Sequence, residues 1–220
     1  MVLEQAATLT EQAEASLEAA IVRGELGPEE KLRIAEIAER LGVSATPMRE
    51  ALSRLVSRGL VIAVGQRGFR VAPVSAEDLA DITRTRVALE NAAIRRSMRA
   101  GDVRWEGEII SSLHQLKRVA GRNKILKATS ELNSIHKLFH ANLIAACGSI
   151  RMQNLAGQLY DQAFRYRSIM LSGAVSADDF VSEHESLAEA VLSRSGNAAA
   201  AKLATHLERT YLDIYGTMPA

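Results

Sequence analysis

The sequence predicts a mainly α-helical protein with two domains: a small N-terminal domain that contains two strands, and a C-terminal bundle of six helices. Only four of the 220 residues are proline, and strand-like runs are few. Apolar residues recur with helical periodicity along most of the chain. Glycines also recur where these periodic segments end, as C-cap glycines do: Gly101, Gly121, Gly148, Gly173, Gly196 and Gly216.

Two short helices and two strands are predicted within residues 34–72, after a first helix at about 10–24. A tight turn at Gly42-Val43 separates the short helices. Ser44 is expected to cap the second of them, whose first turn tolerates Pro47. The positions facing inward at helical spacing are apolar: Ile34, Ile37, Ala38, Leu41, Met48, Ala51, Leu52 and Leu55.

The outward face of the second short helix carries Ala45, Thr46, Arg49 and Ser53, and the two strands fold back around the segment 65–68, Gly-Gln-Arg-Gly. A helix that presents hydroxyls and an arginine from its N-terminal turns is suited to the major groove of DNA. The pattern therefore predicts a winged helix-turn-helix and, with it, binding of double-stranded DNA.

The distribution of charge supports this prediction better than the total of +1 does. Residues 1–30 carry one basic and seven acidic side chains, whereas residues 31–72 carry eight basic and three acidic ones. A basic segment that coincides with the helix-turn-helix is expected for contacts with phosphates.

The boundary between the domains is predicted at residues 73–75, which gives domains of 1–74 and 75–220. Pro73 ends the second strand, and a capping box from Ser75 to Asp78 begins the next helix. Ser149, Ser176 and Asn197 are expected to cap later helices. The six helices of the second domain are expected at about 76–100, 102–120, 126–147, 149–172, 177–195 and 198–215.

Four of the five histidines occupy positions of the second domain where helical periodicity calls for apolar residues. His136 and His140 are one turn apart and point two imidazoles at one place, while His184 and His206 lie on the inner stripes of two other helices. We expect the four to bind one divalent metal ion, with zinc or nickel favoured over cobalt or iron(II). The alternative is four separate structural histidines, each with its own hydrogen-bond partner. His114 lacks the pattern.

Arg86 falls in the middle of the inner stripe formed by Leu79, Ile82, Leu89 and Ala93. A guanidinium in a core requires an anion. Glu90, one turn on, is one candidate partner, and the carboxylate of a small bound effector is the other. The two interpretations are compatible.

Composition narrows the class of protein further. No stretch approaches 18 uncharged apolar residues and no signal peptide opens the chain, so we expect a cytoplasmic protein without a membrane span. The single Cys147 rules out an intramolecular disulfide framework and is expected to be a small buried side chain.

With these motifs in view, the chain resembles the GntR family of bacterial transcription regulators, in the branch with an FCD effector domain of the shorter, six-helix, VanR-like form. The resemblance rests on LRIAEIAERLGVSATPMREALSRLVSRGLV with the GQRG turn, on the stretch RVALE at 86–90, and on HKLFH, Glu183-His184 and His206-Leu207. It implies a homodimer that binds a palindromic operator and responds to a small organic acid held near a metal.

 The resemblance thus predicts a regulator rather than an enzyme, acting most simply as a repressor.

What the resemblance implies for single residues is specific. Ser44, Thr46 and Arg49 match recognition-helix positions that contact DNA, and Arg33 lies near a basic position of the preceding helix. His140, His184 and His206 match three metal-binding histidines, whereas His136 stands where the family usually has Asp, and Ala45 stands where it usually has Arg. At the tip of the wing, the matching positions are Gln66, Arg67 and Gly68.

Two other classes of function remain open at this point. Three histidines and a water could serve a metalloenzyme, although no general base is evident beside them. A structural or protein-binding helical module is the second alternative. The fused DNA-binding module favours a metal-dependent, ligand-responsive transcription regulator over both.

Overall fold

The computed structural model describes residues 7–122, 129–170 and 176–219, without the side chain of Gln66. The described chain divides into two compact units, Met1–Val74 and Ser75–Ala220. Each unit is presented separately below. No helix in the described part of the chain is long and apolar enough to cross a membrane.

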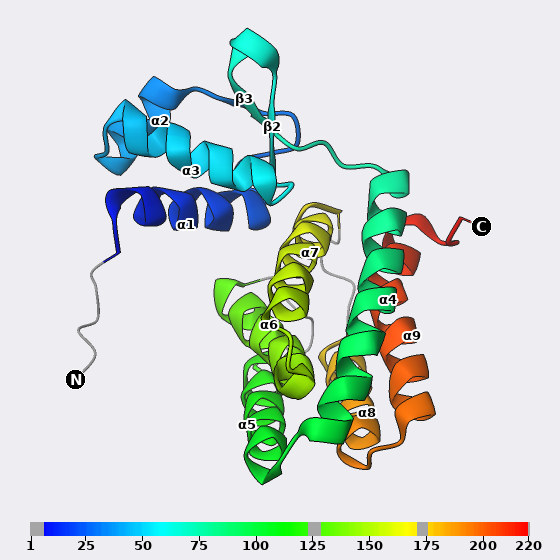
Figure 1. The fold of residues 1–220 in the computed structure, drawn as a ribbon. Coiled ribbons are helices and arrows are strands. Elements are labelled where there is room, and N and C mark those ends of the chain that lie inside the picture. The colour runs from blue at the N-terminus through cyan, green and yellow to red at the C-terminus, as the bar shows by residue number, and fades with distance from the viewer. Residues whose placement is uncertain (1–6, 123–128, 171–175, 220) are drawn as a thin grey trace, which may run out of the picture. The chain divides into compact units, whose positions relative to one another are not determined.

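The first unit contains three helices and a three-stranded antiparallel sheet (Figure 1). The strand order is β1-β3-β2, and the short β1 is an addition to the two strands predicted from the sequence. A 3-10 turn, Gly65–Arg67, joins β2 to β3. The elements are α1 (Leu9–Val22), β1 (Lys31–Leu32), α2 (Ile34–Leu41), α3 (Ala45–Ser57), β2 (Val61–Ala63) and β3 (Phe69–Val71).

Local sequence explains how these elements begin and turn. A capping box of Thr8 and Glu11 starts α1. Gly42 ends α2 with a φ of 65°, a left-handed conformation that glycine adopts without steric cost and that allows the sharp turn into α3. Ser44 precedes α3 with an extended backbone but makes no side-chain capping bond, so that detail of the prediction is wrong.

The core of the first unit is formed by the apolar faces of its helices. Leu17 and Ile21 of α1 are buried together with Met48, Leu52 and Leu55 of α3. The inner stripe predicted for α3 is thereby confirmed. Because this stripe is turned inward, the opposite face of α3 is left to solvent, and Ala45, Thr46, Arg49 and Ser53 are all exposed.

The second unit is a bundle in which six α-helices are described, as predicted (Figure 1). A 3-10 turn, Ala145–Cys147, follows α6, and Cys147 is buried. Asn197 lies inside the first turn of α9 rather than at its N-cap position, which Ser195 occupies. The helices are α4 (Ala76–Ala100), α5 (Val103–Ala120), α6 (Ser130–Ile144), α7 (Ile150–Met170), α8 (Ala177–Leu192) and α9 (Gly196–Tyr215).

The bundle packs α4 against α7 and α9, and α5 against α6 and α8. Ile94, Ile109, Phe139, Leu187 and Val191 contribute fully buried side chains from four of these helices. The predicted inner stripes of α6, α8 and α9 therefore meet in one core. The four histidines lie on the same stripes and are carried into that core with them.

Candidate metal centre and DNA-binding surface

Four histidines from three helices converge inside the second unit. His136 and His140 come from α6, His184 from α8 and His206 from α9, and none is more than 7% exposed. One nitrogen from each ring lies within 4.8 Å of those of the other three. The sequence prediction that helical periodicity would bring these side chains into the core is thus matched by their positions.

The nitrogens that face one another are the Nε2 atoms. Nε2 of His140 lies 3.0 Å from Nε2 of His136 and 3.0 Å from Nε2 of His206. Two nitrogens bound at about 2.1 Å to one ion are about 3.0 Å apart at a right angle and about 3.4 Å apart in a tetrahedron. The spacing around His140 is therefore that of ligands on neighbouring positions of one ion.

Neighbouring groups orient the rings through their other nitrogen. Nδ1 of His184 lies 2.6 Å from the carbonyl oxygen of Phe180, which accepts a hydrogen bond only. Nδ1 of His206 lies 3.1 Å from a carboxylate oxygen of Glu183. The carbonyl oxygen requires a proton on Nδ1 of His184, and the negative charge of Glu183 favours one on Nδ1 of His206, so the Nε2 atoms of both rings present lone pairs to the centre.

His136 is oriented by a tyrosine from α7. Its Nδ1 lies 2.9 Å from the hydroxyl of Tyr160, and that hydroxyl lies 3.1 Å from Oδ1 of Asn133. When Tyr160 donates its proton to Asn133, it accepts one from Nδ1 of His136. The Nε2 atom of His136 then also carries a lone pair toward the centre.

Burial favours the neutral form of His136, His140 and His184. The pKa values of His136, His140 and His184 are all lowered well below the usual value, first by burial and then by the neighbouring histidines. Nε2 of His184 is buried and has no hydrogen-bond partner among the described residues. The converging Nε2 atoms, one of them without a hydrogen-bond partner, fit the donor set of a divalent cation, because a bound cation satisfies them at once.

A small cavity of about 20 Å³ adjoins the histidines. His136, His140 and His206 line it together with Arg86, Tyr160 and Arg167. A second cavity of about 170 Å³, between α4, α6 and α7, shares Arg86, His140 and Tyr160 with the first. A third cavity of about 680 Å³, along α8 and α9, shares Arg167 and His206. The histidine centre is thus bordered by space for a small molecule.

Arg86 lies beside this centre, and its predicted partner is in place. Its Nε donates a hydrogen bond of 2.7 Å to Oε1 of Glu90, and both side chains are buried. The other carboxylate oxygen of Glu90 lies 4.0 Å from Nδ1 of His140. The guanidinium is therefore charge-balanced, and Arg86 borders both the 20 Å³ and the 170 Å³ cavities.

Sequence reasoning missed two residues of α7, Tyr160 and Arg167. They are seven residues apart and therefore share one helix face with the buried Ala163 and Phe164. A polar side chain at an apolar stripe position was the signal used for the histidines and for Arg86. The same signal on α7 was available and would have identified both residues.

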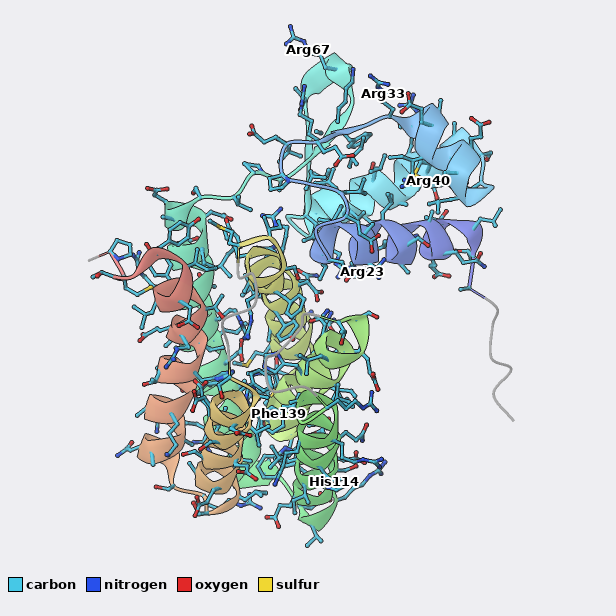
Figure 2. All side chains as sticks on the ribbon, turned by 180° about the vertical axis from the view of Figure 1, so that it is seen from behind. Arg23, Arg33, Arg40, Arg67, His114 and Phe139 are labelled. Atoms are coloured by element: carbon cyan, nitrogen blue, oxygen red, sulfur yellow. The ribbon has the colours of Figure 1, made fainter. Side chains whose placement is uncertain are left out.

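The predicted DNA-contacting residues of the first unit lie on its surface. Ser44, Thr46 and Arg49 are exposed at the start of α3, and Arg67 is exposed at the tip of the β2–β3 turn. Figure 2 shows Arg67 projecting away from this tip. Gly68 follows with a φ of 93°, which explains why a glycine closes the turn. The side chain of Gln66 lies outside the described residues.

Arg33 directly precedes α2 and pairs with Glu36 at 2.7 Å. Together with Arg49 and Arg67 it lines one surface depression, which Lys31 also borders. A helix N-terminus and a wing thus frame a concave surface of positive charge. Such a surface is suited to a helix that reads bases in the major groove and to arginines that bind phosphates.

Comparison with known proteins assigns both units. The family of bacterial regulatory proteins, gntR family, matches residues 9–71, and the FCD domain matches residues 81–209. The HTH-type transcriptional repressor GlaR of Escherichia coli (strain K12) is 34% identical over 191 residues, which cover 85% of this chain and 87% of that protein. The regulator BphR of Paraburkholderia xenovorans (strain LB400) is 36% identical over 194 residues, or 87% and 79% of the two chains.

Solved structures agree with this assignment at the level of fold. The structure of E. coli McbR/YncC superposes with a TM-score of 0.80 at 22% identity and covers 96% of this chain and 98% of that one. The matched families and relatives are transcription regulators, so the metalloenzyme alternative is set aside. The chain belongs to the GntR family of bacterial transcription regulators, with an FCD domain after its helix-turn-helix.

Proposed function

We propose that the protein is a metal-dependent repressor that is released from its operator by a small organic acid. The observation that carries the proposal is the convergence of the histidine Nε2 atoms in the domain that follows the helix-turn-helix. Nitrogen-rich ligation favours zinc or nickel. His136, His140, His184 and His206 would hold the ion, which supplies a Lewis-acidic position for a carboxylate oxygen.

Metal content and stability test this part of the proposal. Protein purified without chelator should carry about one zinc or nickel ion per chain, and the ion should raise the melting temperature because it ties α6, α8 and α9 together. His184→Ala should lower both quantities. His114→Ala is the matched control, since His114 is exposed on α5 (Figure 2). Equal metal content in the two variants contradicts the assignment.

The effector is proposed to be a small carboxylate that binds beside the metal. Arg86 borders both cavities next to His140, and only its Nε is engaged by Glu90. The Nη groups remain suitable donors to a carboxylate. Arg86→Ala should therefore weaken the response of an operator complex to added acid.

The DNA-binding part of the proposal rests on α3 and the wing. Thr46 and Arg49 would contact bases in the major groove, while Arg33 and Arg67 would contact phosphates. A regulator of this kind binds a palindromic operator as a homodimer and works in the cytoplasm, where the DNA is. Analytical ultracentrifugation of the protein, alone and with an operator fragment, measures whether it is a dimer in each case.

A signal from the effector site could reach the linker through α7. The hydroxyl of Tyr166 accepts a hydrogen bond of 3.1 Å from the backbone N–H of Ser75 and donates one to Asp78. Ser75 is the first residue of the second unit. Since Tyr160 and Arg167 border the metal centre on the same helix, a shift of α7 on binding the acid would be transmitted to the start of α4.

A further inference from the structure

The two arginines beside the histidines differ in how their charge is balanced. Arg86 is paired with Glu90 at 2.7 Å. Arg167 has no ion pair or hydrogen bond among the described residues, and its Cζ lies 5.8 Å from the centroid of the Phe180 ring. It borders the 20 Å³ cavity together with His136 and His206.

The carboxylates around the centre are engaged by other groups, and none forms an ion pair with Arg167 among the described residues. Lys137 is paired with Asp161 at 2.7 Å, and Arg209 with Asp213 at 2.9 Å. Glu183 lies against Nδ1 of His206. With a divalent ion on the histidines, the charges of Arg167 and Glu183 cancel formally, and a net positive charge of about two remains in a largely buried region. Such a region favours an anion.

The space next to Arg167 also differs from the space next to Arg86. The 170 Å³ cavity beside Arg86 exposes mostly apolar surface, although Glu90, Lys137, Asn142 and Gln153 border it as well as Ala141, Ile144, Ala156 and Gly157. The 680 Å³ cavity beside Arg167 is bordered mainly by hydroxyl-bearing and charged side chains. These are Ser182, Ser186 and Thr205 with Asp179, Glu183, Lys202 and Arg209.

We propose that Arg167, together with Arg86 across the 20 Å³ cavity, binds the effector's carboxylate beside the metal, and that the rest of the effector occupies the polar cavity along α8 and α9. The planar guanidinium suits a carboxylate because it donates two parallel hydrogen bonds. The polar border predicts an oxygen-rich acid, with a hydroxyl or a second carboxylate, rather than an acid with an alkyl or aryl body. This inference rests on the proposed metal and effector function.

Calorimetric titration of the zinc-loaded full-length protein tests the class of acid. Malate and succinate represent oxygen-rich acids, and butyrate and benzoate represent apolar ones. We expect the first pair to bind at least about tenfold more tightly, as for a site that hydrogen-bonds polar groups of its ligand. Preference for butyrate or benzoate overturns the inference.

Variants of Arg167 test whether this residue binds the carboxylate. Arg167→Gln should weaken malate and succinate binding by about tenfold or more. Arg167→Lys should weaken it less, because lysine keeps the positive charge although it lacks the two parallel donors of the guanidinium. Arg151→Gln, an exposed position on the same helix, is the matched control. Undiminished binding by zinc-loaded Arg167→Gln overturns the inference and leaves Arg86 as the anchor.

Cavity-filling variants provide a second test that does not alter Arg167. Ser186→Leu obstructs the polar cavity, whereas Gly157→Leu obstructs the apolar one, and a Cβ at Gly157 would meet no atom within 4 Å. Loss of acid binding in Ser186→Leu alone supports the inference, and loss in Gly157→Leu alone overturns it. Wild-type protein that holds zinc but binds none of the four acids overturns the proposed effector as well, whereas absence of metal overturns the proposed centre.

Discussion

Acid should destabilise the metal-free protein strongly, because three histidines are buried in their neutral form. The pKa values of His136, His140 and His184 are lowered well below 6.5, chiefly by burial. Below that pH the unfolded chain binds protons at these positions and the folded chain does not. Stability is therefore complete above the unfolded pKa and falls as the pH drops toward the lowered folded values.

The magnitude follows from the number of buried rings. Lowering the pH from about 7.5 to about 5.5 protonates these histidines in the unfolded chain only. Each ring that stays neutral in the folded chain then lowers the free energy of unfolding by about 1.4 kcal/mol. Three such rings amount to about 4 kcal/mol, or a fall in melting temperature of roughly 8–16 °C for a protein of this size. None of the three is more than 5% exposed, so solvent screening reduces this figure little.

Chemical denaturation in the presence of chelator measures this difference at the two pH values. His184→Gln removes one of the three groups and should reduce the pH-dependent loss by about 1.4 kcal/mol. His114→Gln, at an exposed position, should leave the loss unchanged. A wild-type difference below about 1 kcal/mol would refute the reasoning, because the rings would then be accessible to protons in the folded state.

Four further predictions concern the DNA surface, the linker and the buried ion pair. Arg49→Ala should cost about 1–3 kcal/mol of specific operator binding, measured by fluorescence anisotropy against a scrambled fragment; equal loss on both fragments would contradict base contact. Arg67→Ala should reduce the slope of log affinity against log salt by about 1, and an unchanged slope excludes a phosphate contact. Tyr166→Phe removes the hydrogen bonds to Ser75 and Asp78 and should weaken the effect of the acid on operator affinity. Calorimetry should still detect binding of the acid, and an undiminished effect on operator affinity rules out transmission through α7. Glu90→Gln leaves Arg86 buried without its anion and should lower the free energy of unfolding by about 3–5 kcal/mol, with a loss under about 1 kcal/mol indicating a hydrated pair.

The elements of the fold were largely predictable because their signals are local. Apolar residues at helical spacing identified the helices, and Gly42 marked the turn between α2 and α3. Details that depend on a single hydrogen bond were less secure. Ser44 occupies the N-cap of α3 as predicted, yet its side chain makes no capping bond, whereas Asn197 lies inside α9 because the helix already begins at Gly196, after Ser195.

The sequence by itself determined that four histidines would face a core, since a residue's direction on a helix follows from its place in the 3.6-residue repeat. Only the tertiary structure decided that they face one another. His140 and His206 are 66 residues apart in the chain, and their 3.0 Å separation depends on how α6 and α9 pack. The same packing placed Tyr160 against His136 and left Arg167 unpaired beside the centre. Partners across helices arise from three-dimensional packing, which no local repeat encodes.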